Sequence, residues 1–342
     1  MKYLSSGLFL ILSFVGSAQT TLTLPRESQY ASITQRVGIT DITVVYHSPA
    51  VKGRKIFGSL VPYDNWWRAG ANENTTISFS HEVSIEKQKI PAGIYGLHMI
   101  PGTDMWTIIF SNNHTSWGSF FYKKEEDALR VLVKPQAHGF SEWLTYSFVE
   151  KSATSTKLSL IWDKLEVPIL IEVDVKNIVL ANIRNELRGT PAFTWQGWFD
   201  AANFCFENKI NYEEAQHWIE KANKMKPGDF TILRLKASLL EASGNLKGAE
   251  IIMKDLIANA KEADLNAYGY ELLADGKNQE AIGIFNLNVK RHSKSWNVYD
   301  SLAEALEKSG DKAAALKQYE LALKNAPEDQ KKRIEQRILV LK

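Results

Sequence analysis

The chain has 342 residues, with 41 Lys and Arg, 39 Asp and Glu, and a single cysteine. This nearly balanced charge argues against a general nucleic-acid-binding protein, which needs a strongly basic surface. The lone cysteine, Cys205, cannot form an internal disulfide, and its apolar neighbours favour a buried, inert thiol. The fold must therefore be stabilised by its apolar core.

Residues 1–18 have the pattern of a signal peptide. Lys2 is followed by an apolar run from Leu4 to Val15 and then by small residues that end at Ala18. We expect cleavage after Ala18 and a periplasmic or secreted protein of about 320 residues. The run is short for a bilayer span, so an uncleaved anchor is the weaker alternative, and no later stretch is apolar enough to span a membrane.

Residues 24–175 have the pattern of an antiparallel β-sandwich. Short alternating or apolar runs recur every 8–12 residues, and no long amphipathic helix separates them, which disfavours a parallel α/β sheet. The expected strands include 75–79, 94–100, 105–110, 129–133, 142–149, 157–162 and 167–175.

The period becomes helical after Val175. We expect a linking helix at 177–190 and then helical hairpins. In the unit 296–329, large residues alternate with small ones at fixed positions: Tyr299, Leu302, Ala303, Leu306, Gly310, Ala315, Tyr319, Ala322 and Pro327. This unit resembles a tetratricopeptide repeat (TPR), in which small residues let two helices approach and large residues fill the space between hairpins.

Three earlier units keep the same register less strictly. They begin at Gln196, Phe230 and about Glu262, so that four repeats span residues 196–329 and a basic helix at 330–342 caps the stack. The predicted fold is therefore multidomain: a β-sandwich followed by an α-solenoid of TPR-like hairpins. An ordinary helical bundle is the alternative.

The β half also resembles a known family. The stretches 25–28, 49–54, 67–73, 91–97 and 100–102 (PRES, PAVKGR, WRAGANE, PAGIYGL and IPG) are similar to domain-of-unknown-function family 2911. The resemblance covers roughly residues 24–175. It implies an exported protein of Bacteroidetes-type bacteria and implies no activity.

The segment 63–74 is the densest candidate for a ligand site. Its aromatic, guanidinium, amide and carboxylate groups could hold a sugar or a small anion, with a nearby arginine joining them. The predicted ligand-binding residues are Arg54, Trp67, Arg68, Asn72 and Glu73. The structural alternative is that Trp66 or Trp67 plugs the sandwich and Arg68 pairs with Glu73.

Motifs for catalysis, metal binding and cofactor binding are missing from the sequence. The histidines of the β half, His47, His81, His98, His114 and His138, show no metal-ligand spacing, although a site assembled in space stays open. Neither a Gly-x-Ser-x-Gly elbow nor a phosphate-binding glycine loop is present. We therefore expect no catalytic residue, no metal and no cofactor.

The first helix of each TPR hairpin lines the concave face. The partner groove is accordingly predicted to contain Asp200, Phe204, Arg234, Asn266, Tyr270, Asp300 and Glu304. The basic clamp for a peptide carboxylate is missing, so this mixed, acid-leaning groove suits a basic or polar segment better. Alternatively, the groove docks on the protein's own β-domain.

These patterns favour an exported, non-enzymatic scaffold. Its repeats would bind a protein or peptide, and its sandwich a small polar ligand or a partner surface. One alternative is a glycan- or peptide-directed hydrolase with a site near Arg68 and Glu73. Another is a carbohydrate-binding protein without catalysis.

Overall fold

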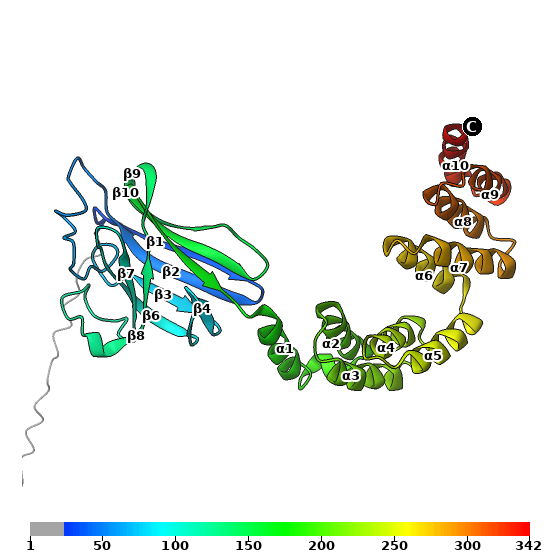
Figure 1. Ribbon diagram of the computed structural model, residues 1–342, viewed down its shortest axis with the longest axis horizontal. Helices are drawn as coiled ribbons and strands as arrows, with labels where there is room; N and C mark the ends of the chain where they lie inside the picture. Colours follow the sequence, from blue (N-terminus) through cyan, green and yellow to red (C-terminus); the bar gives the residue numbers. More distant parts are fainter. Residues whose placement is uncertain (1–23) are drawn as a thin grey trace, which may run out of the picture. The chain divides into compact units, whose positions relative to one another are not determined.

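The computed structural model describes residues 24–342, so the predicted signal peptide lies outside the described residues. The chain divides between Val179 and Leu180 into a β-rich unit and a helical unit. In Figure 1 the strands of the β-rich unit run from blue to green and the helices of the helical unit from green to red. None of the helices in residues 24–342 combines the length and apolar character needed to cross a membrane.

Two antiparallel sheets form the β-rich unit. The larger sheet has the strand order β1-β2-β3-β6-β7-β8 and the smaller sheet the order β5-β4-β10-β9. The strands are β1 (Gln29–Val37), β2 (Thr40–Ser48), β3 (Thr76–Phe79), β4 (Val83–Ile85), β5 (Gln88–Ile90), β6 (Gly93–Ile100), β7 (Trp106–Ser111), β8 (Asp127–Val133), β9 (Gln136–Val149) and β10 (Ser155–Glu172). A short 3₁₀ helix, η1 (Lys124–Glu126), precedes β8. The predicted β-sandwich is confirmed.

Aromatic rings fill the space between the sheets. Phe57 lies between Trp106 of the larger sheet and Trp162 of the smaller one, with ring centroids 5.1 Å and 6.1 Å away. Both tryptophans are fully buried. Burying rings of this size makes a large contribution to the stability of the core.

Two strand predictions need correction. The segments 157–162 and 167–175 are one strand, β10, whose pairing with β9 shifts register around Asp163. Asp163 has a positive φ of 54°, so the strand bends there without ending. Strand β1 was not predicted, because its outward positions are exposed and its alternation is weak.

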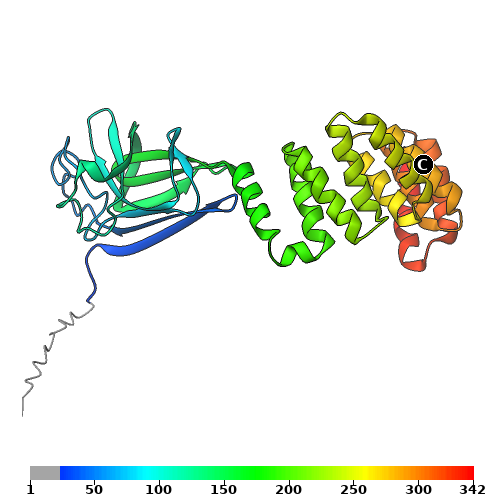
Figure 2. The same cartoon turned by 90° about the horizontal axis from the view of Figure 1, so that it is seen from below.

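The helical unit consists of hairpins that follow one another in the chain (Figure 2). The helices are α1 (Val175–Glu186), α2 (Trp195–Asn208), α3 (Tyr212–Met225), α4 (Phe230–Ala242), α5 (Leu246–Asn259), α6 (Glu262–Ala274), α7 (Asn278–Arg291), α8 (Trp296–Lys308), α9 (Lys312–Asn325) and α10 (Glu328–Leu341), with a short 3₁₀ helix, η2 (Thr190–Phe193), before α2. The pairs α2/α3, α4/α5, α6/α7 and α8/α9 pack as antiparallel hairpins. This is the predicted TPR-like arrangement.

Small residues stand where these hairpins close. Gly269 of α6 lies so near the ring of Phe285 in α7 that a Cβ there would be 2.5 Å from it. Ala303 of α8 and Ala315 of α9 are fully buried in the equivalent places. Between the helices, Gly244, Gly276 and Gly310 adopt φ values of 75–90°, which favour glycine.

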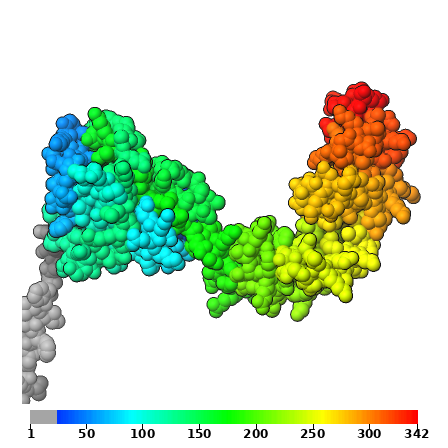
Figure 3. Space-filling view, in the orientation of Figure 1, coloured from blue at the N-terminus to red at the C-terminus, as the bar shows by residue number. Residues whose placement is uncertain are grey.

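The last helix packs on the final hairpin. Ile334 and Ile338 of α10 join a buried cluster with Tyr319 and Ala303. Figure 3 shows α10 at the red end of the helical unit. Its arginines face the acidic side chains of α8, as described below.

Candidate functional site

The loop after Trp66 is held in place by backbone and side-chain bonds. The main chain of Trp67 pairs with Met99 of β6 through two hydrogen bonds of 2.7 and 2.8 Å. The carbonyl of Ala69 accepts hydrogen bonds from the hydroxyls of Tyr146 (2.9 Å) and Thr75 (3.3 Å). Gly70 leaves no room for a side chain, since a Cβ would lie 2.5 Å from Thr75 Oγ1. The loop therefore presents its side chains from a fixed backbone.

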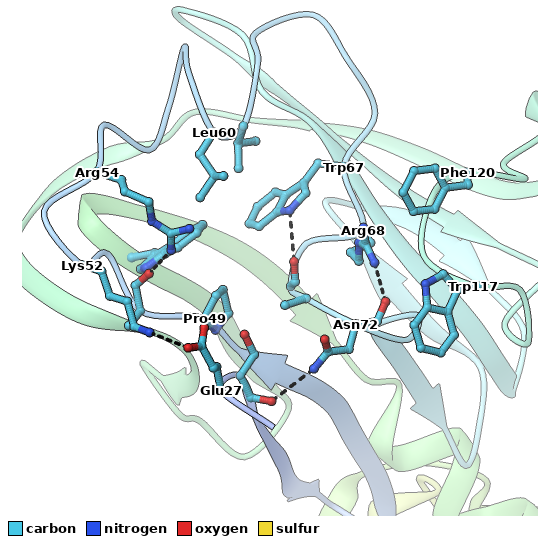
Figure 4. Close-up of a pocket in the computed structure, with 16 residues that line it drawn as sticks. Glu27, Pro49, Lys52, Arg54, Leu60, Trp67, Arg68, Asn72, Trp117 and Phe120 are labelled. Carbon is cyan, nitrogen blue, oxygen red and sulfur yellow. Dashed lines mark hydrogen bonds and ion pairs between the residues drawn. The ribbon is translucent and has the colours of Figure 1, made fainter. Parts of the chain in front are cut away.

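These side chains line a pocket of about 440 Å³. Four of the five predicted ligand-binding residues, Arg54, Trp67, Arg68 and Asn72, line it. In Figure 4, Arg54 and Arg68 stand on opposite sides of the pocket with Trp67 between them. The volume is within the range of small-molecule sites.

Trp67 serves both the core and the pocket. Its ring stacks on Trp162 with centroids 5.9 Å apart and planes inclined by 17°, and its Nε1 donates to the carbonyl of Gly70 at 3.2 Å. Trp66 is 54 % exposed. The structural interpretation, in which Trp66 or Trp67 plugs the sandwich, therefore holds through Trp67.

The two arginines of the pocket hydrogen-bond to backbone carbonyls. Arg68 donates to the carbonyl of Asn72 at 2.5 Å and lies over the ring of Phe120. Arg54 donates to the carbonyls of Val51 (3.0 Å) and Ala50 (2.5 Å). Neither guanidinium forms a salt bridge within residues 24–342.

Glu73 lies on the far side of the loop. Its carboxylate accepts from Arg26 at 2.5 Å and lies 3.3 Å from His47 Nε2, in an adjoining pocket of about 610 Å³. Burial opposes ionisation of Glu73, but the hydrogen bond from Arg26 and the nearby charges of His47 and Arg26 lower its pKa. The alternative in which Glu73 pairs with Arg68 is therefore wrong.

Several lining residues were missed from the sequence. Leu60, Trp117 and Phe120 surround the pocket and are 46 %, 49 % and 74 % exposed. The sequence signal that could have indicated them is the density of aromatic residues at 117–122, because a solvated turn does not need so many apolar rings.

A serine–histidine pair lies beside this pocket. Ser119 Oγ is 2.8 Å from Nδ1 of His98, and Ser119 lines a smaller hollow together with Arg68. His98 is 1 % exposed, and burial lowers its pKa to about 4. Such a weak base accepts a serine proton poorly, so the pair is better explained as a satisfied buried histidine.

Within residues 24–342, no cluster of three His, Cys, Asp or Glu side chains could hold a metal ion. Cys205 is buried, as predicted, and burial raises the pKa of its thiol to about 11.

The predicted groove residues of the last two repeats contact their own chain. Tyr270 donates to Glu304 at 2.9 Å, and Glu304 lies 3.6 Å from Lys308. Asp300, 7 % exposed, accepts from Arg333 of α10 at 2.7 Å. The capping helix therefore neutralises part of the acidic groove.

The remaining predicted groove residues are differently engaged. Asp200 is exposed and Phe204 is half-buried against the first helical core. Asn266 has a buried Oδ1 without a hydrogen-bond partner among the described residues. Arg234 pairs with Glu271 at 2.8 Å.

An opening of about 530 Å³ lies between the second and third hairpins. Arg234 and Glu241 of α4 line one side of it, and Glu271 of α6 and the following Asp275 and Lys277 line the other. Carboxylates thus outnumber cations among the described lining residues, and two of the carboxylates, Glu241 and Asp275, form no salt bridge within residues 24–342. The opening is therefore accessible and acid-leaning.

Three solved structures are similar to part of this chain. PilF of Pseudomonas aeruginosa is 15 % identical (TM-score 0.28), covering 44 % of this chain and 68 % of its own. A thermophilic TPR protein of Thermus thermophilus is 17 % identical (TM-score 0.29; 48 % and 91 % covered). YrrB, a TPR protein with an unusual peptide-binding site, is 15 % identical (TM-score 0.28; 47 % and 83 % covered).

No curated protein matches the chain. Residues 28–171 match a family described as protein of unknown function (DUF2911). The β-rich unit is therefore similar to the DUF2911 family over residues 28–171, and TPR-like hairpins follow it in the same chain.

Proposed function

We propose that this is an exported interaction scaffold with two binding surfaces. The TPR-like unit binds a basic or polar segment of a protein, and the DUF2911 domain binds a small polar ligand. The observation that carries the first half is the acid-leaning opening between α4 and α6, since a cationic side chain entering it would meet Glu241 and Asp275.

The pKa of Glu271 supports a basic partner. Burial raises it, and the charge of Asp275 raises it further against the lowering effect of Arg234. A cation bound there would offset this cost, so binding and ionisation of Glu271 favour each other.

Peptide selection on the full chain tests the scaffold. A random peptide library selected on the wild type should yield Lys- or Arg-containing sequences that bind Glu241→Arg at least tenfold more weakly. Glu250→Arg is the matched control, because Glu250 is an exposed glutamate of α5 outside the opening. Selection of no saturable peptide, or equal binding by both variants, would count against the peptide-binding role. Binding only after removal of residues 24–175 would instead support docking of the β-domain in the groove.

The second half rests on the 440 Å³ pocket of the DUF2911 domain. It combines aromatic faces with Arg54, Arg68 and Asn72, groups that orient a small polar molecule. Carbohydrate binding without catalysis fits the same pocket.

The pocket does not favour a hydrolase. Among the described residues that line it, Glu27 is the one carboxylate, and Glu27 lies 3.2 Å from the ammonium of Lys52. A pair of carboxylates with divided acid and base roles is therefore missing there.

Tryptophan fluorescence tests the pocket. The protein is titrated with a panel of sugars and organic acids. At least one compound should change the emission of the wild type and of Trp143→Phe, and the same compound should change the emission of Trp117→Phe much less. Both tryptophans are similarly exposed, and only Trp117 lines the pocket. An unchanged spectrum with every compound would refute small-ligand binding.

A further inference from the structure

We propose that the ligand of the DUF2911 pocket is an acidic saccharide whose negative groups are bound by Arg54 and Arg68 and whose ring packs on the aromatic wall. This inference rests on the small-ligand half of the proposed function and specifies its chemistry.

The first step is the charge of the pocket. Lys52, Arg54 and Arg68 line it, and Glu27 is the one lining carboxylate among the described residues. Because Lys52 is 3.2 Å from Glu27, these two charges compensate each other. The two guanidinium groups are left to give the pocket its positive charge.

The second step is the unused bonding capacity of the arginines. A guanidinium has five N–H donors, and Arg68 uses one of them, toward the carbonyl of Asn72. Burial lowers the pKa of Arg68, so its charge is held at a cost that no carboxylate among residues 24–342 offsets. Carboxylate and phosphate oxygens are the acceptors that fit such a fork bidentately.

The third step is the separation of the arginines. In Figure 4 they face the pocket from opposite sides, with Trp67 between them. A molecule with two acidic groups, held apart by rings, can reach both.

The fourth step concerns the exposed apolar rim. Leu60, Trp117 and Phe120 remain in solvent although each is large and apolar. A grouping of such residues around a pocket marks a binding surface. The flat rings of Trp117 and Phe120 match the apolar face of a sugar ring, while Asn72 and the backbone of Ser28 supply polar groups at the pocket wall.

Calorimetric titration of the full chain with two matched disaccharides tests this inference. Digalacturonate and galactobiose differ in having a carboxylate or a hydroxymethyl group on each ring. We expect digalacturonate to bind at least tenfold more tightly, with an affinity that falls as salt is raised. Arg54→Gln and Arg68→Gln should each weaken it at least tenfold, and Lys55→Gln, beside the pocket but not lining it, should not.

Each variant is measured together with its melting curve, because Arg54, although exposed, donates to the carbonyls of Val51 and Ala50, and Arg68 donates to that of Asn72. Equal affinity for the two disaccharides, or unchanged binding by Arg54→Gln with an unaltered melting curve, would overturn the inference. If neither disaccharide binds but another member of the fluorescence panel does, the acidic-saccharide assignment fails and small-ligand binding stands. If nothing binds, both fail.

Discussion

Burial decides the protonation state of His98 in the β-domain more than the nearby charges do. Its imidazole is enclosed on β6, hydrogen-bonded to Ser119 and 5.2 Å from the ring of Tyr122. The nearby charges act in opposite directions, since Asp127 raises the pKa of His98 and Arg68 lowers it. Desolvation dominates, and the ring is neutral at physiological pH.

Acid should destabilise the domain through His98. The folded-state pKa of about 4 lies below the unfolded value of about 6.5, so the unfolded state binds the proton first. The stabilisation is present above pH 6.5 and is lost as pH falls toward 4, with a total of about 3 kcal/mol. Urea denaturation of the wild type between pH 4 and pH 7 should show this extra slope.

His98→Gln is the control for this titration, since glutamine can keep a hydrogen bond to Ser119 without titrating. The difference in unfolding free energy between wild type and variant should shrink by about 3 kcal/mol from pH 7 to pH 4. A difference that is constant across this range would show that His98 keeps an ordinary pKa.

The structure brings Arg54 and Arg68 to one pocket and Glu73 to another, and the reason is local geometry. The segment 67–73 was treated as one cluster, but Ala69 and Asn72 adopt φ values of 50° and 57°. These left-handed residues turn the chain, so Arg68 and Glu73 leave the loop on different sides. Composition cannot reveal such turns when the residues are not glycine.

At the scale of elements, the repeat register predicted the helical hairpins well, because its small residues mark the places where two helices pack together. Gly269 and Ala303 occupy the same unit position, and both are buried where two helices meet. The long strand β10 was divided in two because a bulge at Asp163 interrupts its pattern without ending its pairing. The periodicity of a sequence therefore predicts that an element exists more reliably than it predicts where the element begins and ends.

Gly269→Ala should destabilise the third hairpin. Alanine gains up to about 1 kcal/mol of helix propensity over glycine, but its Cβ would lie 2.5 Å from the fully buried ring of Phe285. Overpacking of this kind costs about 1–3 kcal/mol, so a net loss of about 1 kcal/mol is expected in urea denaturation.

Gly283→Ala is the matched control, because Gly283 is an exposed glycine of α7 whose Cβ would meet nothing within 4 Å. It should stabilise the protein by about 0.5–1 kcal/mol. Equal shifts for the two variants would mean that α6 and α7 are less closely packed than described.

Arg333→Ala should show that α10 is part of the stack. It leaves Asp300, 7 % exposed, without its cation. Because Arg333 itself is partly exposed, we expect a loss of about 1–3 kcal/mol, below the full cost of a broken buried pair. Lys332→Ala, at an exposed neighbour, should change the unfolding free energy by less than about 0.5 kcal/mol.

At the scale of the whole molecule, the two units have separate apolar cores. The sandwich core is built around Phe57, Trp106 and Trp162, and the helical unit has three clusters of its own. Each core closes within its own unit, so the division near Val179 separates two structures that are each stabilised internally.

Calorimetry should therefore resolve two unfolding transitions that respond to different substitutions. Phe57→Ala removes a ring that contacts both buried tryptophans and should cost about 3–5 kcal/mol in the sandwich. At about 2–4 °C per kcal/mol for a domain of this size, its transition should fall by roughly 6–20 °C while the other stays fixed. Arg333→Ala should lower the helical transition alone, and that transition should be broad, since stacked repeats unfold with limited cooperativity. A single transition that moves with both substitutions would show instead that the two cores unfold together and depend on one another.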